Sequence, residues 1–119
     1  MARGYLTTHV LDTALGRPAE GVKLSLFRLE DTARTRLTML FTNADGRTDE
    51  PVLPEAGFAP GTYELVFRVG DYLDRTHGPA EQPRFLDLIP IRFSISDADA
   101  HYHVPLLLSP YGYSTYRGS

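Results

Sequence analysis

A two-residue alternation of apolar and polar side chains runs through most of this chain and constrains its fold more than any other feature. It extends over residues 22–30, 36–42, 62–69 and 87–96. Because successive side chains of a strand point to opposite faces, each apolar row is expected to lie on a core, with the polar row toward solvent or a partner. The apolar rows are Val22, Leu24 and Leu26; Leu37, Met39 and Phe41; Tyr63, Leu65, Phe67 and Val69; and Ile89, Ile91, Phe93 and Ile95.

Turn signals separate these runs and give a count of about eight strands. One short helix is predicted from Asp71 to His77, ended by Gly78-Pro79. Pro90 lies on the outward face of its strand, which favours an edge position. The pattern predicts an all-β fold, an eight-stranded antiparallel β-sandwich with one short helix. The strands are expected at about 6–11, 22–30, 36–42, 48–53, 62–69, 87–96, 101–108 and 112–117.

The composition sets limits on domain count, chemistry and location. A chain of 119 residues fits one domain, 1–119. The absence of cysteine excludes disulfides, thiolate zinc sites and cysteine nucleophiles. A net charge of −3 gives no basic field for phosphate backbones, so nucleic acid is not an expected partner. No apolar run reaches the ~20 residues of a membrane span, and no signal-peptide core follows Met1, so a cytoplasmic protein is expected.

The four histidines are the first candidates for chemistry. His101 and His103 form a His-x-His pair on one face of a predicted strand, opposite the apolar Tyr102 and its alternating successors. Two imidazoles at this spacing can chelate a metal, and His9 could supply a third ligand. No carboxylate accompanies the pair on its strand, so the metal interpretation is the weaker one. His77 closes the predicted helix, where a cation suits the helix C-terminus.

The carboxyl-terminal region predicts a covered surface. The face that carries His103 continues with Pro105 and Leu107, and the last strand adds Tyr111, Tyr113 and Tyr116. Such weakly charged, tyrosine-rich faces are typical of partner contacts, and self-association into a closed assembly is the simplest form. A pocket between subunits would leave His103 in a partly dry setting.

The remaining charged residues give little information about function by themselves. Arg47 follows the turn Ala44-Asp45-Gly46 and in isolation is an ordinary hairpin arginine. Four carboxylates are interpreted as turn or surface charges. No nucleophile elbow, phosphate-binding loop or paired-carboxylate motif is found. Spacing alone therefore leads to an oligomeric β-sandwich with a candidate histidine site. The four carboxylates are Asp12, Glu20, Asp45 and Asp49.

Three segments carry a resemblance to a known family. The first is Leu6-Thr7-Thr8-His9-Val10-Leu11-Asp12 with Gly16-Arg17-Pro18-Ala19, and the second is Asp45-Gly46-Arg47. The third is the tail from His101 to Ser119, which ends in Tyr116-Arg117-Gly118-Ser119. Together they resemble the 5-hydroxyisourate hydrolases, the transthyretin-related family, over essentially the whole chain. The terminal Tyr-Arg-Gly-Ser is the most specific element and separates these hydrolases from the hormone-carrying transthyretins.

The resemblance implies a transthyretin (prealbumin)-like sandwich that assembles as a homotetramer, a dimer of dimers, with active sites in a channel at the dimer–dimer interface. It implies hydrolysis of 5-hydroxyisourate, the product of urate oxidation, without a cofactor or a metal. His9, Arg47, His103 and Ser119 are the implied catalytic residues, and His9, Arg47 and Tyr116 the implied substrate-binding residues. His101 is not among them.

Two other classes of protein compete with this interpretation. A transthyretin-like carrier would bind a small aromatic ligand in the same channel without chemistry, but it would lack the histidine–arginine set and the terminal motif. A generic adhesion sandwich gives histidines on a tyrosine-rich face no evident purpose. The enzyme is the interpretation that uses all the motif residues.

Overall fold

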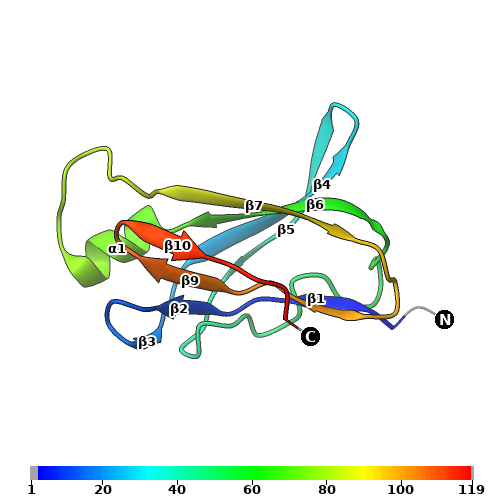
Figure 1. Ribbon diagram of the computed structural model, residues 1–119, viewed down its shortest axis with the longest axis horizontal. Coiled ribbons are helices and arrows are strands. Elements are labelled where there is room, and N and C mark those ends of the chain that lie inside the picture. Colours follow the sequence, from blue (N-terminus) through cyan, green and yellow to red (C-terminus); the bar gives the residue numbers. More distant parts are fainter. Residues whose placement is uncertain (1–2, 119) are drawn as a thin grey trace.

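Residues 3–118 are described by the computed structural model, and within them the chain forms ten strands and one helix. Figure 1 shows the helix at one end of two layers of strands. The all-β class with one short helix is confirmed. The elements are β1 (Tyr5–Thr7), β2 (Val10–Asp12), β3 (Arg17–Pro18), β4 (Lys23–Glu30), β5 (Ala33–Phe41), β6 (Gly61–Arg68), α1 (Gly70–His77), β7 (Leu88–Ile95), β8 (His101–His103), β9 (Leu106–Ser109) and β10 (Gly112–Ser114).

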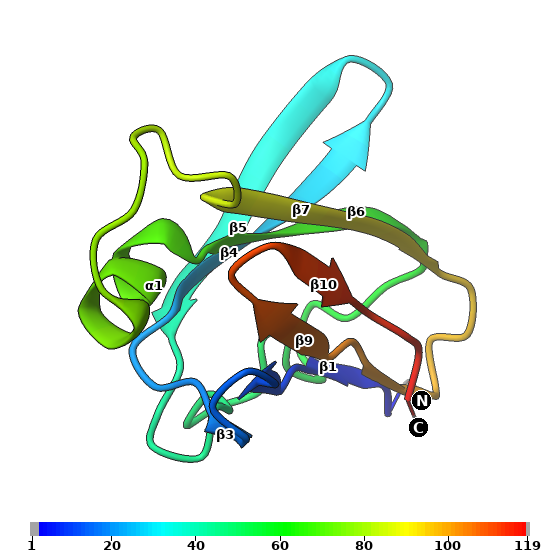
Figure 2. The ribbon, with the colours of Figure 1, turned by 60° about the vertical axis from the view of Figure 1, so that its left-hand side comes forward.

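The strands divide into two layers that face each other (Figure 2). One layer is the antiparallel sheet β5-β4-β6-β7. The other layer contains the four-stranded sheet β10-β9-β2-β3 and the two-stranded pair β1-β8. The pair adjoins the sheet because β1 directly precedes β2, and β8 directly precedes β9, along the chain. Pro90 lies in β7 at the edge of its sheet, as predicted, where its missing N–H costs no ladder bond.

The second layer is not wholly antiparallel, because β1 pairs with β8 and β2 with β9 in parallel. The predicted strands 6–11 and 101–108 are each interrupted where Pro105 cannot donate a backbone hydrogen bond. Main-chain bonds still cross the interruption, from the Val104 N–H to the Thr7 carbonyl at 3.0 Å and from the Leu106 N–H to the His9 carbonyl at 2.9 Å. The amino-terminal and carboxyl-terminal segments thus form one continuous ladder.

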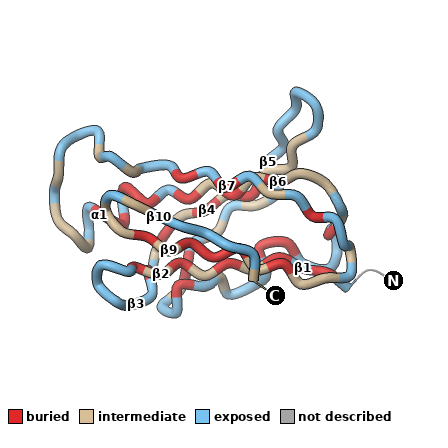
Figure 3. Tube along the Cα trace, viewed as in Figure 1, coloured by how far each residue is buried: buried red, intermediate tan, exposed pale blue. Residues whose placement is uncertain are grey.

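The core lies between the two layers (Figure 3). The apolar rows of β4, β6 and β7 are buried as predicted, since Leu24, Leu65 and Ile89 are at most 1% exposed. The row opposite the two strand histidines is buried as well, in Tyr102 and its successors. Fully burying one such aliphatic or aromatic side chain contributes about 1.5–3 kcal/mol before the entropy cost of folding.

Two sequence-based predictions are wrong in detail. Residues 48–53 form no strand and contribute only a bridge between Leu53 and Leu6. The row Leu37, Met39 and Phe41 points outward and is between 39% and 57% exposed, because the inner face of β5 carries Leu40 instead. The alternation identified a strand correctly, but it could not tell which of two partly apolar faces meets the core.

The helix α1 begins at Gly70, one residue earlier than predicted, and ends at His77, with Gly78 as its C-cap. Among residues 3–118 no helix is long and apolar enough to cross a membrane. The helix is fastened to the end of β2 through Asp12, whose carboxylate accepts hydrogen bonds from Tyr72 Oη and His77 Nε2, each at 2.7 Å. The helix therefore has a polar anchor besides its buried Leu73.

Asp12 was predicted to be a turn or surface charge, and this is wrong. Its side chain is fully buried, and it also accepts the backbone N–H groups of Ala14 and Leu15. Burial acts to raise the pKa of Asp12, but the hydrogen bonds from His77, the Leu15 N–H and Tyr72 outweigh it and hold the pKa below its usual value. The turn after β2 and the helix α1 bury the carboxylate together, because the amides of the turn and the side chains of the helix surround it.

We predict that Asp12→Asn lowers the free energy of unfolding at pH 7 by at least about 1.5–3 kcal/mol, the typical contribution of one hydrogen bond to a charged group. The group's pKa is lowered on folding, so its stabilisation is present above pH ~4 and is lost as pH falls through the folded-state pKa. Urea unfolding of both proteins at pH 7 and at lower pH measures this. Asp31→Asn, in the exposed β4–β5 turn, is the control, and equal midpoints for Asp12→Asn and wild type at pH 7 would contradict the prediction.

Candidate active site

The parallel pairing of β1 with β8 determines where the predicted site forms. It sets Thr7 opposite His103 and Tyr5 opposite His101. These side chains, with Arg47 from the loop after β5, line a cavity of about 470 Å³. Two of the predicted site residues, Arg47 and His103, therefore share one cavity although they lie far apart in the sequence. The other lining residues are Thr8, Thr48, Asp49, Glu50 and Pro51.

The loop that carries Arg47 is held by its own hydrogen bonds. The Asn43 side-chain Oδ1 accepts the N–H groups of Asp45 at 2.9 Å and Arg47 at 3.1 Å, and the Asn43 N–H donates to the Arg47 carbonyl at 2.7 Å. Gly46 adopts a φ of 76°, and a Cβ there would lie 2.3 Å from the Val10 carbonyl oxygen. Both the conformation and the close approach require glycine. The loop is thus pressed against β2.

His9 fixes the same loop from the side of β2. Its Nε2 is 2.8 Å from the Asp45 carbonyl oxygen, and the Val10 N–H donates to the Gly46 carbonyl at 2.7 Å. A carbonyl only accepts hydrogen bonds, so Nε2 carries the proton and the neutral His9 ring has its lone pair on Nδ1. His9 is half-buried and does not line the cavity wall itself. The structure therefore places it beside the Arg47 loop.

His103 is held by both its backbone and its side chain. Its Nδ1 lies 2.8 Å from Thr7 Oγ1. Its carbonyl accepts the Gly118 N–H at 2.7 Å, and its N–H donates to the Gly118 carbonyl at 3.3 Å. A Cβ on Gly118 would come within 3.0 Å of the His103 ring, so only a residue without a side chain fits there without movement. The tail consequently runs directly beside the imidazole.

The rest of the terminal motif lies next to the site. The Arg117 guanidinium stacks over the Tyr102 ring at 4.1 Å from its centroid. Tyr116 is 57% exposed and lines a separate cavity of about 230 Å³ together with Arg117. Within one protomer the structure does not bring Tyr116 to the Arg47 cavity. Ser119 lies outside the described residues.

Burial and positive charge both act on the two histidines. Burial, then the Arg47 guanidinium, and then the neighbouring His101 and His9 hold the pKa of His103 below its usual 6.5. Burial followed by the Arg47 charge also lowers the pKa of His9, against a smaller opposing effect of Asp45. Both imidazoles are therefore neutral at pH 7. A neutral imidazole next to a permanent cation can accept a proton and stabilise negative charge.

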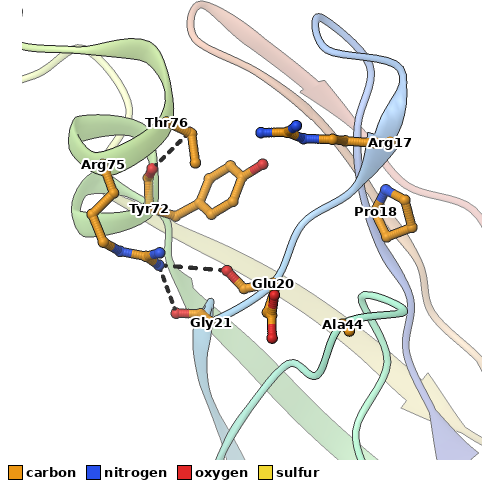
Figure 4. A pocket seen from close by; sticks show the side chains of 8 residues that line it. All are labelled: Arg17, Pro18, Glu20, Gly21, Ala44, Tyr72, Arg75 and Thr76. Atoms are coloured by element: carbon orange, nitrogen blue, oxygen red, sulfur yellow. Dashed lines mark hydrogen bonds between the residues drawn. The ribbon is translucent and has the colours of Figure 1, made fainter.

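Figure 4 shows a larger cavity, of about 800 Å³, between β3 and α1. Arg75 reaches across it and donates to the carbonyls of Glu20 at 3.5 Å and Gly21 at 3.2 Å. None of the predicted site residues lines this cavity. The larger cavity is lined by Arg17 as well as Arg75, but it holds no predicted site residue, so the smaller cavity with Arg47 and His103 is the candidate active site.

The structure adds residues that the sequence did not single out. Thr7 belongs to the amino-terminal motif, yet only the pairing with β8 reveals that it contacts the strand histidines. Asn43 organises the arginine loop and had no sequence signal beyond its place before a turn. Within residues 3–118 no group of three or more His, Asp or Glu side chains is arranged to hold a metal ion.

Comparison with known proteins places the chain in a family. A model described as the HIUase/Transthyretin family matches residues 6–118. The chain belongs to this family, and the resemblance of the motif residues is thereby confirmed.

Individual relatives agree in sequence and in structure. The chain is 64% identical over 116 residues to 5-hydroxyisourate hydrolase 2 of Rhizobium meliloti (strain 1021), covering 98% of this chain and 97% of the relative. The solved 5-hydroxyisourate hydrolase of Klebsiella pneumoniae has a TM-score of 0.78 at 37% identity, covering 97% of this chain and 99% of that one. A solved (S)-allantoin synthase has a TM-score of 0.92 at 45% identity, covering 99% of this chain and 44% of the synthase chain. The chain thus spans less than half of the synthase.

We predict that Arg47→Gln raises the pKa values of His9 and His103 toward 6.5 without reaching it. The substitution removes the guanidinium charge, whereas the burial that lowers both values remains. Titration of the imidazole carbon protons by NMR measures both values in each protein. An Arg47→Gln protein in which both histidines titrate as in wild type would show that the guanidinium does not act on them.

Proposed function

We propose that this chain, as one domain over residues 1–119, hydrolyses 5-hydroxyisourate to 2-oxo-4-hydroxy-4-carboxy-5-ureidoimidazoline in urate degradation. Curated relatives over nearly the full length carry the name of that hydrolase, at up to 64% identity. The observation that carries the proposal is the shared cavity of Arg47 and His103, in which the guanidinium charge and burial both favour a neutral imidazole.

The reaction opens a cyclic acyl–nitrogen bond, and the protein must assist it at three points. Water must lose a proton as it adds to the carbonyl carbon, the carbonyl oxygen becomes an oxyanion, and the departing nitrogen takes up a proton. The His103 ring is proposed to take the water proton and to return it to the nitrogen, with His9 sharing the positioning of the water. Arg47 is proposed to hold the substrate carbonyls and to stabilise the oxyanion.

Tyr116 and Ser119 are proposed to orient substrate and water by hydrogen bonds. The tail passes beside His103 through the Gly118 backbone pair, which supports a role for the residues next to it. Tyr116 is exposed in the protomer and is not among the residues that line the Arg47 cavity, so its action is proposed to depend on assembly.

The assembly is proposed to be a homotetramer, a dimer of dimers, with the sites at the dimer–dimer interface. Exposed aromatic side chains near the carboxyl end support a covered surface there. The proposed chemistry uses water and the side chains of this protein, without a cofactor. A cytoplasmic location is proposed for the protein. The exposed aromatic residues are Tyr111, Tyr113 and Tyr116.

We expect His103→Ala and His9→Ala to lose at least about 100-fold in kcat/KM, because general acid–base catalysis typically contributes ~10²–10⁴-fold. The measurement is the absorbance decay of 5-hydroxyisourate freshly generated from urate, compared with its spontaneous decay. Wild-type activity is expected to fall as pH drops below 6.5 and protonates these rings. His77→Gln, which lies away from the cavity and keeps a side-chain N–H donor toward Asp12, is the matched control. Activity of either test variant within threefold of wild type would remove that histidine from the mechanism, and an unchanged decay with wild-type protein would favour the carrier.

We predict that the wild-type chain has a solution mass of four times 13.3 kDa by light scattering. Removal of residues 116–119 is expected to keep the fold, because the buried core contains none of residues 116–118. Turnover is expected to be lost, since the tail beside His103 is gone. A monomeric wild-type protein would contradict the proposed assembly, and full activity in the shortened chain would exclude the tail from the mechanism.

A further inference from the structure

The Thr7 hydroxyl lies between the two imidazoles of the His-x-His strand. Its Oγ1 is 2.6 Å from Nε2 of His101 and 2.8 Å from Nδ1 of His103. The parallel register of β1 and β8 produces this arrangement, because it sets Thr7 directly opposite His103. One hydroxyl group therefore connects the ring proposed as the base to a second ring that the mechanism does not use.

A hydroxyl has one hydrogen, so Thr7 can donate to one ring only, and a Thr7 that donates to one ring accepts from the other. When Thr7 donates to His101, it accepts the Nδ1–H of His103, and the neutral His103 ring keeps its lone pair on Nε2. When Thr7 donates to His103 instead, the proton of that ring lies on Nε2, and Nε2 has no lone pair for a water proton. The tautomers of the two rings are thus coupled through one hydrogen atom.

When His103 takes up a proton, Thr7 can only accept the Nδ1–H of that ring and can no longer donate to it. The imidazolium formed in that step donates from both of its nitrogens, so Nδ1–H needs Thr7 Oγ1 as its acceptor. The Thr7 hydrogen is then available for Nε2 of His101 when that ring is neutral with its own proton on Nδ1. In this arrangement a base at His103 is supported by an acceptor at His101, with the threonine between them.

The surroundings hold this arrangement in place. The His101 ring stacks on Tyr5 with centroids 4.2 Å apart and planes 8° from parallel. The Thr7 backbone is fixed by the Val104 N–H, which donates to its carbonyl at 3.0 Å. Among the described residues, no charged side chain at the cavity hydrogen-bonds to either ring; the charged residues that line it are Arg47, Asp49 and Glu50.

We propose that Thr7 and His101 are positioning residues for the hydrolysis: Thr7 accepts the Nδ1–H of His103 and donates to His101, which holds His103 in the tautomer whose Nε2 can take a proton from water. The same role recurs in catalytic triads, where a third group holds the base in its working tautomer. This inference rests on the proposed function, with His103 as a base.

The kinetic test compares two substitutions at one position. Thr7→Val removes the hydroxyl at nearly constant volume and is expected to lower kcat about 10- to 100-fold with KM within threefold, less than the loss of the base itself. Thr7→Ser keeps the hydroxyl and is expected to retain kcat within threefold. Thr62→Val, which removes a hydroxyl facing Ser94 in the other layer, is the matched control.

The second arm replaces the partner ring. His101→Phe keeps an aromatic ring against Tyr5 but offers no acceptor, so its kcat is expected to fall as in Thr7→Val. His101→Gln retains a side-chain oxygen as an acceptor and is expected to recover part of the loss. The imidazole ¹⁵N shifts of His103 report its tautomer in each full-length protein. We expect the Nδ1–H form in wild type and Thr7→Ser, and a mixture with the Nε2–H form in Thr7→Val and His101→Phe.

The outcomes separate this inference from the function on which it rests. A wild-type protein that does not accelerate the decay of 5-hydroxyisourate overturns the proposed function. If wild type is active and His103→Ala is not, the function stands and the positioning role is tested alone. It is overturned if Thr7→Val keeps the wild-type kcat, if Thr7→Ser loses as much as Thr7→Val, or if the His103 tautomer is the same in all variants.

Discussion

The candidate site depends on the parallel pairing of the amino-terminal strands with strands near the carboxyl end. This ladder joins β1 to β8 and β2 to β9, and it brings Thr7, His9 and His103 into one neighbourhood. The other layer supplies the apolar surface against which the ladder packs, and its edge strand β5 leads into the loop that carries Arg47. A change of register by one residue would turn each of these side chains to the opposite face.

The sequence predicted the parts of the fold that follow from local chemistry. The alternations of β4, β6 and β7, the helix before Gly78 and the edge position of Pro90 all follow from side-chain period, turn residues and the missing proline N–H. The common face of His101 and His103 follows in the same way, and their shared contact with Thr7 agrees with it. The roles of His9, Arg47 and Tyr116 came from family resemblance, and they remain proposals.

What the sequence could not predict are contacts between distant segments. The parallel direction of the ladder has no local signal. Asp12 reads as a turn residue, but its carboxylate is buried because a helix sixty residues away supplies Tyr72 Oη and His77 Nε2 as donors. The outward orientation of Met39 and Phe41 depends on which face of β5 meets the other layer. The coupling of two imidazoles by Thr7 can be recognised only when both the register of β1 against β8 and the side-chain rotamers are known.

The separation of Thr7 from His103 along the chain, 96 residues, has a consequence during synthesis. At roughly 5–20 residues per second, a ribosome needs about 5–20 s to make the segment between them. Throughout that interval β1 lacks its partner β8, and the strand edge that β8 later covers is open to association with other chains. The protein acquires its acid–base groups as a working set only in the final moments of translation, so a stalled or truncated product that lacks β8 would also lack the His103 side of the site.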